Sequence, residues 1–272
     1  MVTFPNCKIN IGLNILGKRE DGYHNIQTVF YPIPITDALE VIECPNSGEA
    51  IKFTASGIHV PGKAGSNLCT RAYEILKQDF PGLPSIKMHL HKVIPMGAGL
   101  GGGSADAAFT LELLNSKFSL QLSSEQLMEY ALQLGRDCPF FIFNKPCVGT
   151  GRGEVLTPIE LDVSAYKIFL INPGIDISTH LAFSQITIAE QSENLAELIL
   201  KPIKEWKQFI FNDFEIPVFN TYSEIADIKT ALYGNGALYA GMSGSGSTVY
   251  GIFQKAGLSK MNFPTHYFQR WI

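Results

Sequence analysis

Apolar and polar residues alternate along residues 8–16, KINIGLNIL. The apolar positions of this segment are Ile9, Ile11, Leu13 and Ile15. A period of two predicts a half-buried β-strand. Lys8 and Asn10 share its polar face, which favours a common polar site over the competing interpretation of Lys8 as a solvated strand residue.

Other segments show either the strand period or the helix period. Alternation predicts a strand over residues 86–90, and short strands are expected near residues 40–43 and 51–54. Ser66-Asn67 can cap a helix, and Ser123 with Gln126 can form the capping box of another, which Gly135 is placed to end. Their apolar stripes are Leu68, Ala72, Ile75 and Leu76 in the first, and Leu127, Ala131 and Leu134 in the second.

The second half of the chain repeats this mixture of strands and helices. A strand is expected over residues 167–171 and another over residues 248–253, with two helices between them. A change of composition near residues 149–158, GTGRGEVLTP, marks a domain boundary. We therefore expect two α/β domains, residues 1–153 and 154–272.

Composition narrows the classes of function. The chain has 272 residues, 46% of them apolar, and its net charge of −4 argues against a nucleic-acid-binding protein, which needs a basic surface. The five cysteines contain no CxxC pair and are expected to be reduced, small apolar fillers. With no signal peptide and no apolar run of membrane-spanning length, a cytoplasmic protein with no membrane partner is expected.

The strongest chemical signal is the loop PMGAGLGGGSADAA, which starts at Pro95. Five glycines stand among residues 97–103, between a predicted strand and a predicted helix. Glycine allows positive φ and close approach of a ligand, and the free N–H groups of a helix start attract anions. A tight turn without ligand explains so many glycines poorly, because each costs roughly 0.5–1 kcal/mol relative to alanine. The loop therefore predicts a phosphate site.

Two familiar phosphate loops fit less well. Gly97, Gly99 and Gly102 match GxGxxG, but the acid that a dinucleotide site needs about 20 residues later is missing, since Glu125 falls in a predicted helix. The pattern GxxxxGK[ST] fails because Gly103 stands where its lysine must be.

The loop resembles instead the second signature of the GHMP kinase superfamily. KINIGLNILGKREDGYHNIQT resembles the first signature of one branch, the 4-diphosphocytidyl-2-C-methyl-erythritol kinases, and its GYH triplet distinguishes this branch from mevalonate, homoserine and galactose kinases. LGRDCPFF resembles the catalytic-acid segment, and AGMSGSGSTVYGIF resembles the third signature. The motifs occur in the expected order over nearly the whole chain.

The resemblance implies a fold and a reaction. The fold would be α+β in two layers, with an ATP domain like ribosomal protein S5 domain 2 and a ferredoxin-like C-terminal domain. The enzyme would transfer the γ-phosphoryl group of ATP, with Mg²⁺, to the 2-hydroxyl of diphosphocytidyl-methylerythritol, a step of non-mevalonate isoprenoid synthesis. A GHMP kinase for another small alcohol and a catalytically silent nucleotide-binding protein remain alternatives.

The resemblance also implies the catalytic pair Lys8 and Asp137. Asp137 would accept or orient the hydroxyl proton, and Lys8 would hold that carboxylate and stabilise charge on the γ-phosphoryl group. Because an ammonium lowers the pKa of a nearby carboxylate, orientation would be the larger role of Asp137. Without the other motifs, Asp137 would be interpreted as an ordinary polar residue in a turn.

For the acceptor, the resemblance implies that Tyr23 and Phe183 sandwich the cytosine while His24 binds its edge. Asn10 and Thr179 would contact the diphosphate or sugar. Stacking on an aromatic ring is worth roughly 1–3 kcal/mol per base in single-strand binders. The competing interpretation of Tyr23 and Phe183 is core packing.

For ATP, the resemblance implies Asn67 near the nucleobase and a run of residues around the phosphates. This run is Pro95, Met96, Gly97, Ala98, Gly99, Leu100, Gly101, Gly102, Gly103, Ser104 and Ala105. The third Gly-rich motif supplies Gly241, Ser243, Gly244, Ser245 and Gly246. Ser104 is the candidate Mg²⁺ ligand, and the expected state is a monomer or weak homodimer.

Two residues depart from the family pattern. Ala98 stands where glycine is usual, so it tests whether that position needs positive φ. Cys138 stands beside Asp137 where an aliphatic residue is usual.

Overall fold

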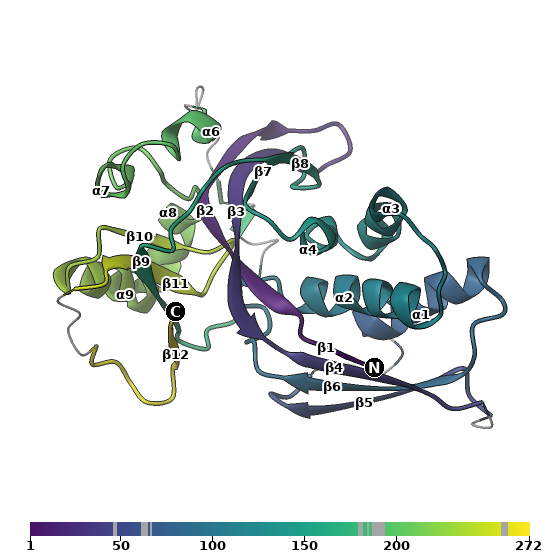
Figure 1. Ribbon diagram of the computed structural model, residues 1–272. Coiled ribbons are helices and arrows are strands. Elements are labelled where there is room, and N and C mark those ends of the chain that lie inside the picture. Colours follow the sequence, from purple (N-terminus) through teal and green to yellow (C-terminus); the bar gives the residue numbers. More distant parts are fainter. Residues whose placement is uncertain are drawn as a thin grey trace. The chain divides into compact units, whose positions relative to one another are not determined.

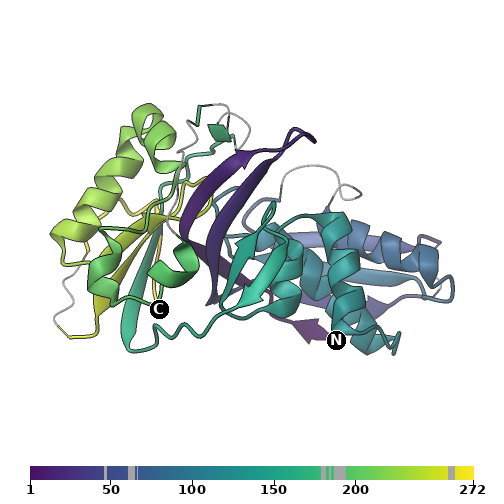
Figure 2. The same ribbon diagram turned by 90° about the horizontal axis from the view of Figure 1, so that it is seen from above.

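The computed structural model describes residues 1–45, 48–60, 65, 67–178, 182–183, 185–186, 194–256 and 261–272 (Figures 1 and 2). These residues form two compact units. The first unit contains Met1–Cys7, Pro34–Met96 and Gly101–Asn144, and the second contains Lys8–Ile33, Gly97–Leu100 and Lys145–Ile272. The predicted domains, residues 1–153 and 154–272, divide the chain differently, and that boundary stays a prediction.

The first unit is built on a sheet with strand order β1-β4-β6-β5. Its strands are β1 (Val2–Thr3), β4 (Ala38–Glu43), β5 (Ile51–Gly57) and β6 (Ile86–Lys92). β5 runs parallel to β6 and the other pairs are antiparallel. The helices of this unit are α1 (Leu68–Asp79), α2 (Gly102–Lys117), α3 (Ser124–Leu134) and α4 (Cys138–Phe143).

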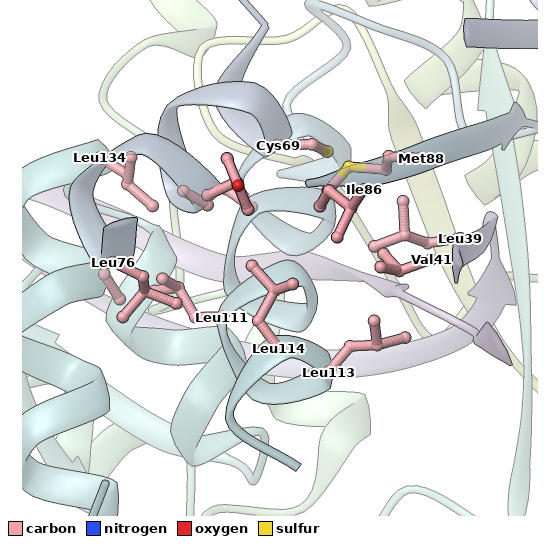
Figure 3. Close-up of a cluster of buried hydrophobic side chains, with 14 of the residues drawn as sticks. Leu39, Val41, Cys69, Leu76, Ile86, Met88, Leu111, Leu113, Leu114 and Leu134 are labelled. Atoms are coloured by element: carbon pink, nitrogen blue, oxygen red, sulfur yellow. The ribbon is translucent and has the colours of Figure 1, made fainter. Parts of the chain in front are cut away.

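A leucine-rich core joins this sheet to its helices (Figure 3). Val41 and Met88 project from the strands, and Leu76 and Leu111 project from α1 and α2. The predicted alternation in β6 is confirmed, because Ile86, Met88 and Leu90 are buried in the core. Burial of such an apolar face is the main term that holds a two-layer unit together.

The predicted helix starts are largely confirmed. The Asn67 carboxamide caps α1 by accepting a hydrogen bond from Cys69 N at 2.8 Å, whereas Ser66 lies outside the described residues. Ser123 and Gln126 form both hydrogen bonds of a capping box at α3. Gly135 follows the last residue of α3, and its N–H donates to Ala131 O.

The second unit contains two sheets. One has the order β10-β11-β9-β12 and is antiparallel, and the other has the order β2-β3-β7-β8. The first sheet comprises β9 (Tyr166–Asn172), β10 (Tyr239–Met242), β11 (Val249–Gln254) and β12 (Phe268–Trp271). The other comprises β2 (Asn6–Lys18), β3 (His24–Thr36), β7 (Cys147–Thr150) and β8 (Val155–Pro158), and the first residues of β2 and last residues of β3 belong to the first unit.

The helices of the second unit are α6 (Leu195–Leu198), α7 (Ile203–Trp206), α8 (Glu215–Thr221) and α9 (Ser223–Gly234). Of these, α8 and α9 share a core with the antiparallel sheet. Ile225, Ile228 and Leu232 of α9 pack in one core with strand residues such as Ala240 and Val249. Among the described residues, no helix is both long and apolar enough to cross a bilayer. All five cysteines are free thiols, as expected.

Candidate functional site

The glycine-rich loop adopts the backbone that only glycine takes easily. Gly97, Gly99 and Gly101 have φ of 63°, 75° and 68°. In this left-handed region an L side chain is strained, so these three glycines are explained by backbone conformation alone.

Gly99 is also required by close packing within the second unit. A Cβ at Gly99 would lie 1.9 Å from the carbonyl oxygen of Ser243, an overlap that only backbone movement could relieve. The second and third Gly-rich motifs are therefore in direct backbone contact here.

Ala98 answers the question raised by its departure from the family pattern. The φ of Ala98 is not positive, and its side chain is buried. Its carbonyl accepts a hydrogen bond from Thr248 N at 3.2 Å. Alanine is therefore accommodated without strain.

Gly103 has a different reason to be glycine. It lies in the first turn of α2, where its φ is not positive, and a Cβ built there meets none of the described atoms within 4 Å. Neither backbone strain nor packing explains this glycine. Open space above a helix start is what close approach of a phosphate requires.

Gly103 borders a cavity in the first unit. The cavity is lined by Val60, Asn67, Leu68, Leu90, Lys92, Met96, Gly103 and Asp106. Asn67, Met96 and Gly103 were predicted as ATP-binding residues, and the structure brings them together here. An apolar wall with a few polar groups is typical of a site for a nucleobase.

A charged cluster that no sequence motif indicates lies on this cavity. Lys92 Nζ donates to Asp106 Oδ2 at 2.7 Å and to Asp37 Oδ2, and all three side chains are buried. Asp37 Oδ1 also accepts from Val93 N and Ile94 N. Asp106 Oδ1 is the buried side-chain oxygen for which the described part of the chain offers no partner. The cluster thus combines two carboxylates with one ammonium and leaves one oxygen of Asp106 without a partner among the described residues.

Burial changes the acid–base behaviour of this cluster. Burial raises the pKa of Asp106 to about 7, although the Lys92 ammonium opposes the change. Burial lowers the pKa of Lys92, but the carboxylates of Asp106 and Asp37 outweigh it and raise that pKa. Lys92 therefore stays charged, while Asp106 takes up a proton as the pH falls through neutrality.

Asp106→Asn should change how stability depends on pH. Because the folded pKa of Asp106 exceeds its unfolded value, folded protein binds more protons than unfolded protein between about pH 4 and 7, so this group's contribution to stability falls as pH rises. Between pH 5 and pH 8, the free energy of unfolding of the variant should therefore rise by about 1 kcal/mol or more relative to that of the wild type. Urea unfolding at both pH values checks this, and equal differences at the two would refute it.

Lys8 and Asn10 lie in a buried network of the second unit. The two residues are 3% and 2% exposed, so the competing interpretation of Lys8 as a solvated strand residue is wrong, and this end of β2 is buried on both faces instead of half-buried. Lys8 Nζ donates to Asn10 Oδ1 at 2.5 Å and to Gly99 O at 2.9 Å. Asn10 Nδ2 donates to Thr28 Oγ1. These hydrogen bonds fix the position of the Lys8 ammonium within the second unit.

Ser243 of the third motif completes this network. Its hydroxyl donates to Gly99 O at 2.8 Å and accepts from Asn10 N at 3.1 Å. Gly244 lies beside Asn10 and Gly99, and Gly244 and Gly246 have positive φ. Gly241 is buried in β10, and Ser245 is half-buried.

Asp137 belongs to the first unit and is half-buried at the start of α4. It occupies the N-cap position, yet its side chain makes no capping hydrogen bond. A carboxylate at an N-cap normally accepts from the helix N–H groups, so capping of α4 is not the reason for an aspartate here.

Ser104 and Cys138 contact each other in the same unit. Burial raises the pKa of the Cys138 thiol to about 12, although a hydrogen bond with Ser104 lowers it. Cys138 is therefore protonated at neutral pH and acts as a small apolar residue, not as a nucleophile.

Aromatic side chains gather near the predicted acceptor residues of the second unit. The rings of His24 and Phe183 stack with centroids 4.9 Å apart, and Phe183 packs edge-on against Phe214. Tyr23 is 41% exposed, and its ring faces the Arg152 guanidinium at 5.4 Å. Burial, with the positive charge of Lys18, lowers the pKa of His24 and favours its neutral ring. Thr179 lies outside the described residues.

Similarity to known proteins agrees with these motifs. The family description "GHMP kinases N terminal domain" matches residues 67–145, and "GHMP kinases C terminal" matches residues 193–260. A 4-diphosphocytidyl-2-C-methyl-D-erythritol kinase of Bacteroides fragilis is 50% identical over 97% of this chain and 96% of its own. One from Azobacteroides pseudotrichonymphae is 48% identical over 98% of this chain and 100% of its own.

A solved structure supports the same grouping. The crystal structure of a 4-(cytidine 5'-diphospho)-2C-methyl-D-erythritol kinase superposes with a TM-score of 0.77 at 28% identity, covering 93% of this chain and 90% of that one. The expected α+β fold with GHMP kinase N- and C-terminal domains is thereby confirmed.

Proposed function

Because the chain belongs to the 4-diphosphocytidyl-2-C-methyl-D-erythritol kinase family of GHMP kinases, we propose that it phosphorylates the 2-hydroxyl of this diphosphocytidyl alcohol. ATP is the phosphoryl donor, and the products are the 2-phosphate and ADP. The reaction places the enzyme in non-mevalonate isoprenoid precursor synthesis.

One observation carries this proposal beyond overall similarity. Lys8 and Asn10 of the first motif, Gly99 of the second and Ser243 of the third join in a single buried hydrogen-bond network. Segments far apart in sequence supply one ammonium and a set of oriented polar groups. Such preorganised charge is what phosphoryl transfer needs, because its loose transition state requires positioning and electrostatic stabilisation.

The proposed catalytic residues are Lys8 and Asp137. The hydroxyl oxygen attacks the γ-phosphorus as the bond to the β–γ bridging oxygen breaks, and the hydroxyl proton passes to Asp137. The Lys8 ammonium stabilises charge on the transferred group. Asp137 has no capping function that competes with this role.

ATP is proposed to bind at the glycine-rich loop, with its base in the cavity beside Asn67 and Met96. The described residues contain no group of three His, Cys, Asp or Glu side chains able to cage a metal. Mg²⁺ commonly takes few protein ligands beside nucleotide phosphates, so the residues present fit an ion carried by ATP, with the Ser104 hydroxyl as candidate ligand. Bound there, Mg²⁺ would neutralise charge on the β- and γ-phosphates.

The acceptor is proposed to bind against Tyr23, His24 and Phe183, with Asn10 and Thr179 toward its diphosphate or sugar. The proposed sandwich places the cytosine between Tyr23 and Phe183, with His24 at its edge. His24 already stacks on one face of Phe183, so the cytosine would use the other face of Phe183 or displace His24.

The remaining proposals concern the whole chain. The domain boundary at residue 153 falls between the two matched family segments, at residues 67–145 and 193–260. A cytoplasmic location, a monomeric or weakly dimeric state and the lack of a nucleic-acid partner rest on composition.

A turnover assay with several acceptors tests the function. Purified protein and Mg-ATP are mixed with the diphosphocytidyl alcohol, mevalonate, homoserine or galactose, and ADP release is followed. We expect turnover with the diphosphocytidyl alcohol and formation of its 2-phosphate. Turnover with mevalonate or homoserine but not with that acceptor would overturn the proposal, and no turnover with any acceptor would favour a silent nucleotide-binding protein.

Gly103→Ala separates ligand contact from folding. A new methyl group at Gly103 meets none of the described atoms and needs no unusual φ, and alanine is the better helix former by about 1 kcal/mol. The variant should be at least as stable as wild type but bind ATP about tenfold or more weakly, since the methyl group occupies phosphate space. Thermal unfolding and calorimetric titration measure the two effects. Unchanged ATP affinity would exclude Gly103 from the phosphate site.

A further inference from the structure

Asn212 uses its whole carboxamide to hold the third Gly-rich motif. Its Nδ2 donates to Met242 O at 2.7 Å and to Gly244 O at 2.8 Å, and its Oδ1 accepts from Phe214 N at 3.0 Å. The residue is 3% exposed. The two N–H donors of Asn212 therefore hold the carbonyls immediately before and after Ser243. The hydrogen bond from Phe214 N fixes the orientation of the Asn212 carboxamide.

Ser243 connects Asn212 to the surroundings of Lys8. The Ser243 hydroxyl and the Lys8 ammonium donate to the same acceptor, Gly99 O, at 2.8 and 2.9 Å. Gly99 cannot move toward Ser243, because their backbones are already in van der Waals contact. A shift of Ser243 would therefore change both the phosphate loop and the surroundings of the ammonium.

Two neighbours of Asn212 attach the same segment to both sides of the network. Asp213 N donates to Leu13 O at 2.8 Å, and Asp213 Oδ2 accepts from Ile15 N at 2.6 Å, so this segment runs along β2. Glu215 Oε1 accepts from Met242 N at 2.9 Å, and Lys229 holds its other oxygen. The segment around Asn212 is thus hydrogen-bonded both to β2, which carries Lys8 and Asn10, and to the third motif.

We propose that Asn212 is a positioning residue for phosphoryl transfer, which sets Ser243 and, through Gly99, the Lys8 ammonium. Asn212 touches neither Lys8 nor Gly99 in the hydrogen bonds that hold it, so its effect is indirect. The kinetic part of this inference rests on the proposed function, whereas the structural part does not.

Asn212→Asp tests the kinetic part, because it keeps the side-chain volume and removes both donors. With Mg-ATP and the diphosphocytidyl acceptor, kcat should fall about 10- to 100-fold while KM for either substrate changes less than about threefold, since small misplacement of a catalytic group costs rate more than binding. Asn212→Ala, which removes the donors without adding charge, should show the same split.

Asn235→Asp is the matched control. Asn235 also donates from Nδ2 to a backbone carbonyl, that of Ala231 at 2.8 Å, but on the exposed end of α9. The substitution Asn235→Asp should leave kcat unchanged. A folded Asn212 variant with kcat within twofold of wild type, or an equal loss in Asn235→Asp, would overturn the proposal.

Native-state amide exchange tests the structural part independently of any reaction. In Asn212→Asp, the amides of Ser243 and Gly246 should exchange at least tenfold faster, and those within α9 should not. If neither Asn212 variant folds, the wild type decides, because both amides should then be protected as strongly as those of β10. Unchanged exchange in the variant, or loop-like exchange in wild type, would refute the positioning role even if turnover is normal. Absence of wild-type turnover would refute only the proposed function.

Discussion

Asp137→Asn should lower turnover by about 10²-fold or more, because the amide can neither accept the hydroxyl proton nor orient it as a carboxylate does. ATP binding should be largely unchanged, since the change concerns the acceptor hydroxyl. Single-turnover kinetics and an ATP titration measure the two quantities separately.

Asp227→Asn provides the control for loss of one negative charge. Asp227 is exposed on α9 and belongs to none of the motifs. It should keep wild-type turnover. Near-normal turnover in Asp137→Asn would remove this residue from the mechanism and leave Lys8 as the proposed catalytic group.

The second large effect is expected from Gly99→Ala, which should destabilise the protein by about 2–5 kcal/mol. The new Cβ would lie 1.9 Å from Ser243 O at a φ of 75°, so backbone strain and backbone overlap act together. Whatever folded protein remains should turn over at least tenfold more slowly, because relief of the overlap displaces the carbonyl that Lys8 and Ser243 share. Urea unfolding and kcat check both effects.

Gly174→Ala isolates the contribution of backbone strain. Gly174 has a φ of 80°, but a Cβ there meets none of the described atoms within 4 Å. The substitution Gly174→Ala should lower the free energy of unfolding by about 1–2 kcal/mol and leave kcat unchanged. Equal destabilisation in the two variants would show that the contact between Gly99 and Ser243 is softer than its geometry indicates.

Lys92 shows how a local signal can be present in a sequence and still be overlooked. Ile86, Met88 and Leu90 set the buried phase of β6, and Lys92 continues that phase, so a lysine at a core position was visible in the sequence. Its partners were not, because Asp37 and Asp106 are distant from it or on another element: the pairing of β4 with β6 brings Asp37 to Lys92, and the packing of α2 on the sheet brings Asp106. The lysine is consequently buried as a paired ion, which the alternation rule does not anticipate.

Asn212 carried no local signal at all. It lies in neither a strand nor a helix, and no spacing relates it to residues 242–244. Asparagine is common in turns, so the residue looked ordinary. Its proposed positioning role follows from the fold, which places the carbonyls of Met242 and Gly244 within hydrogen-bonding distance of its amide group.

Local rules determined the features that depend on neighbours in sequence. The strand period of β2 and β6, the Asn67 cap, the Ser123 capping box and the left-handed glycines of the phosphate loop all follow from side-chain size, hydrogen-bonding groups and φ within a few residues. Tertiary structure decided which of these features share an environment. The sequence placed Lys8 and Asn10 on one polar face, but only the fold brings Gly99 to Lys8 as an acceptor and Ser243 to the same carbonyl, and only the fold buries the ammonium. Burial and partner choice are properties of the packed molecule, so the motifs could be recognised in sequence, whereas the network that joins them could not.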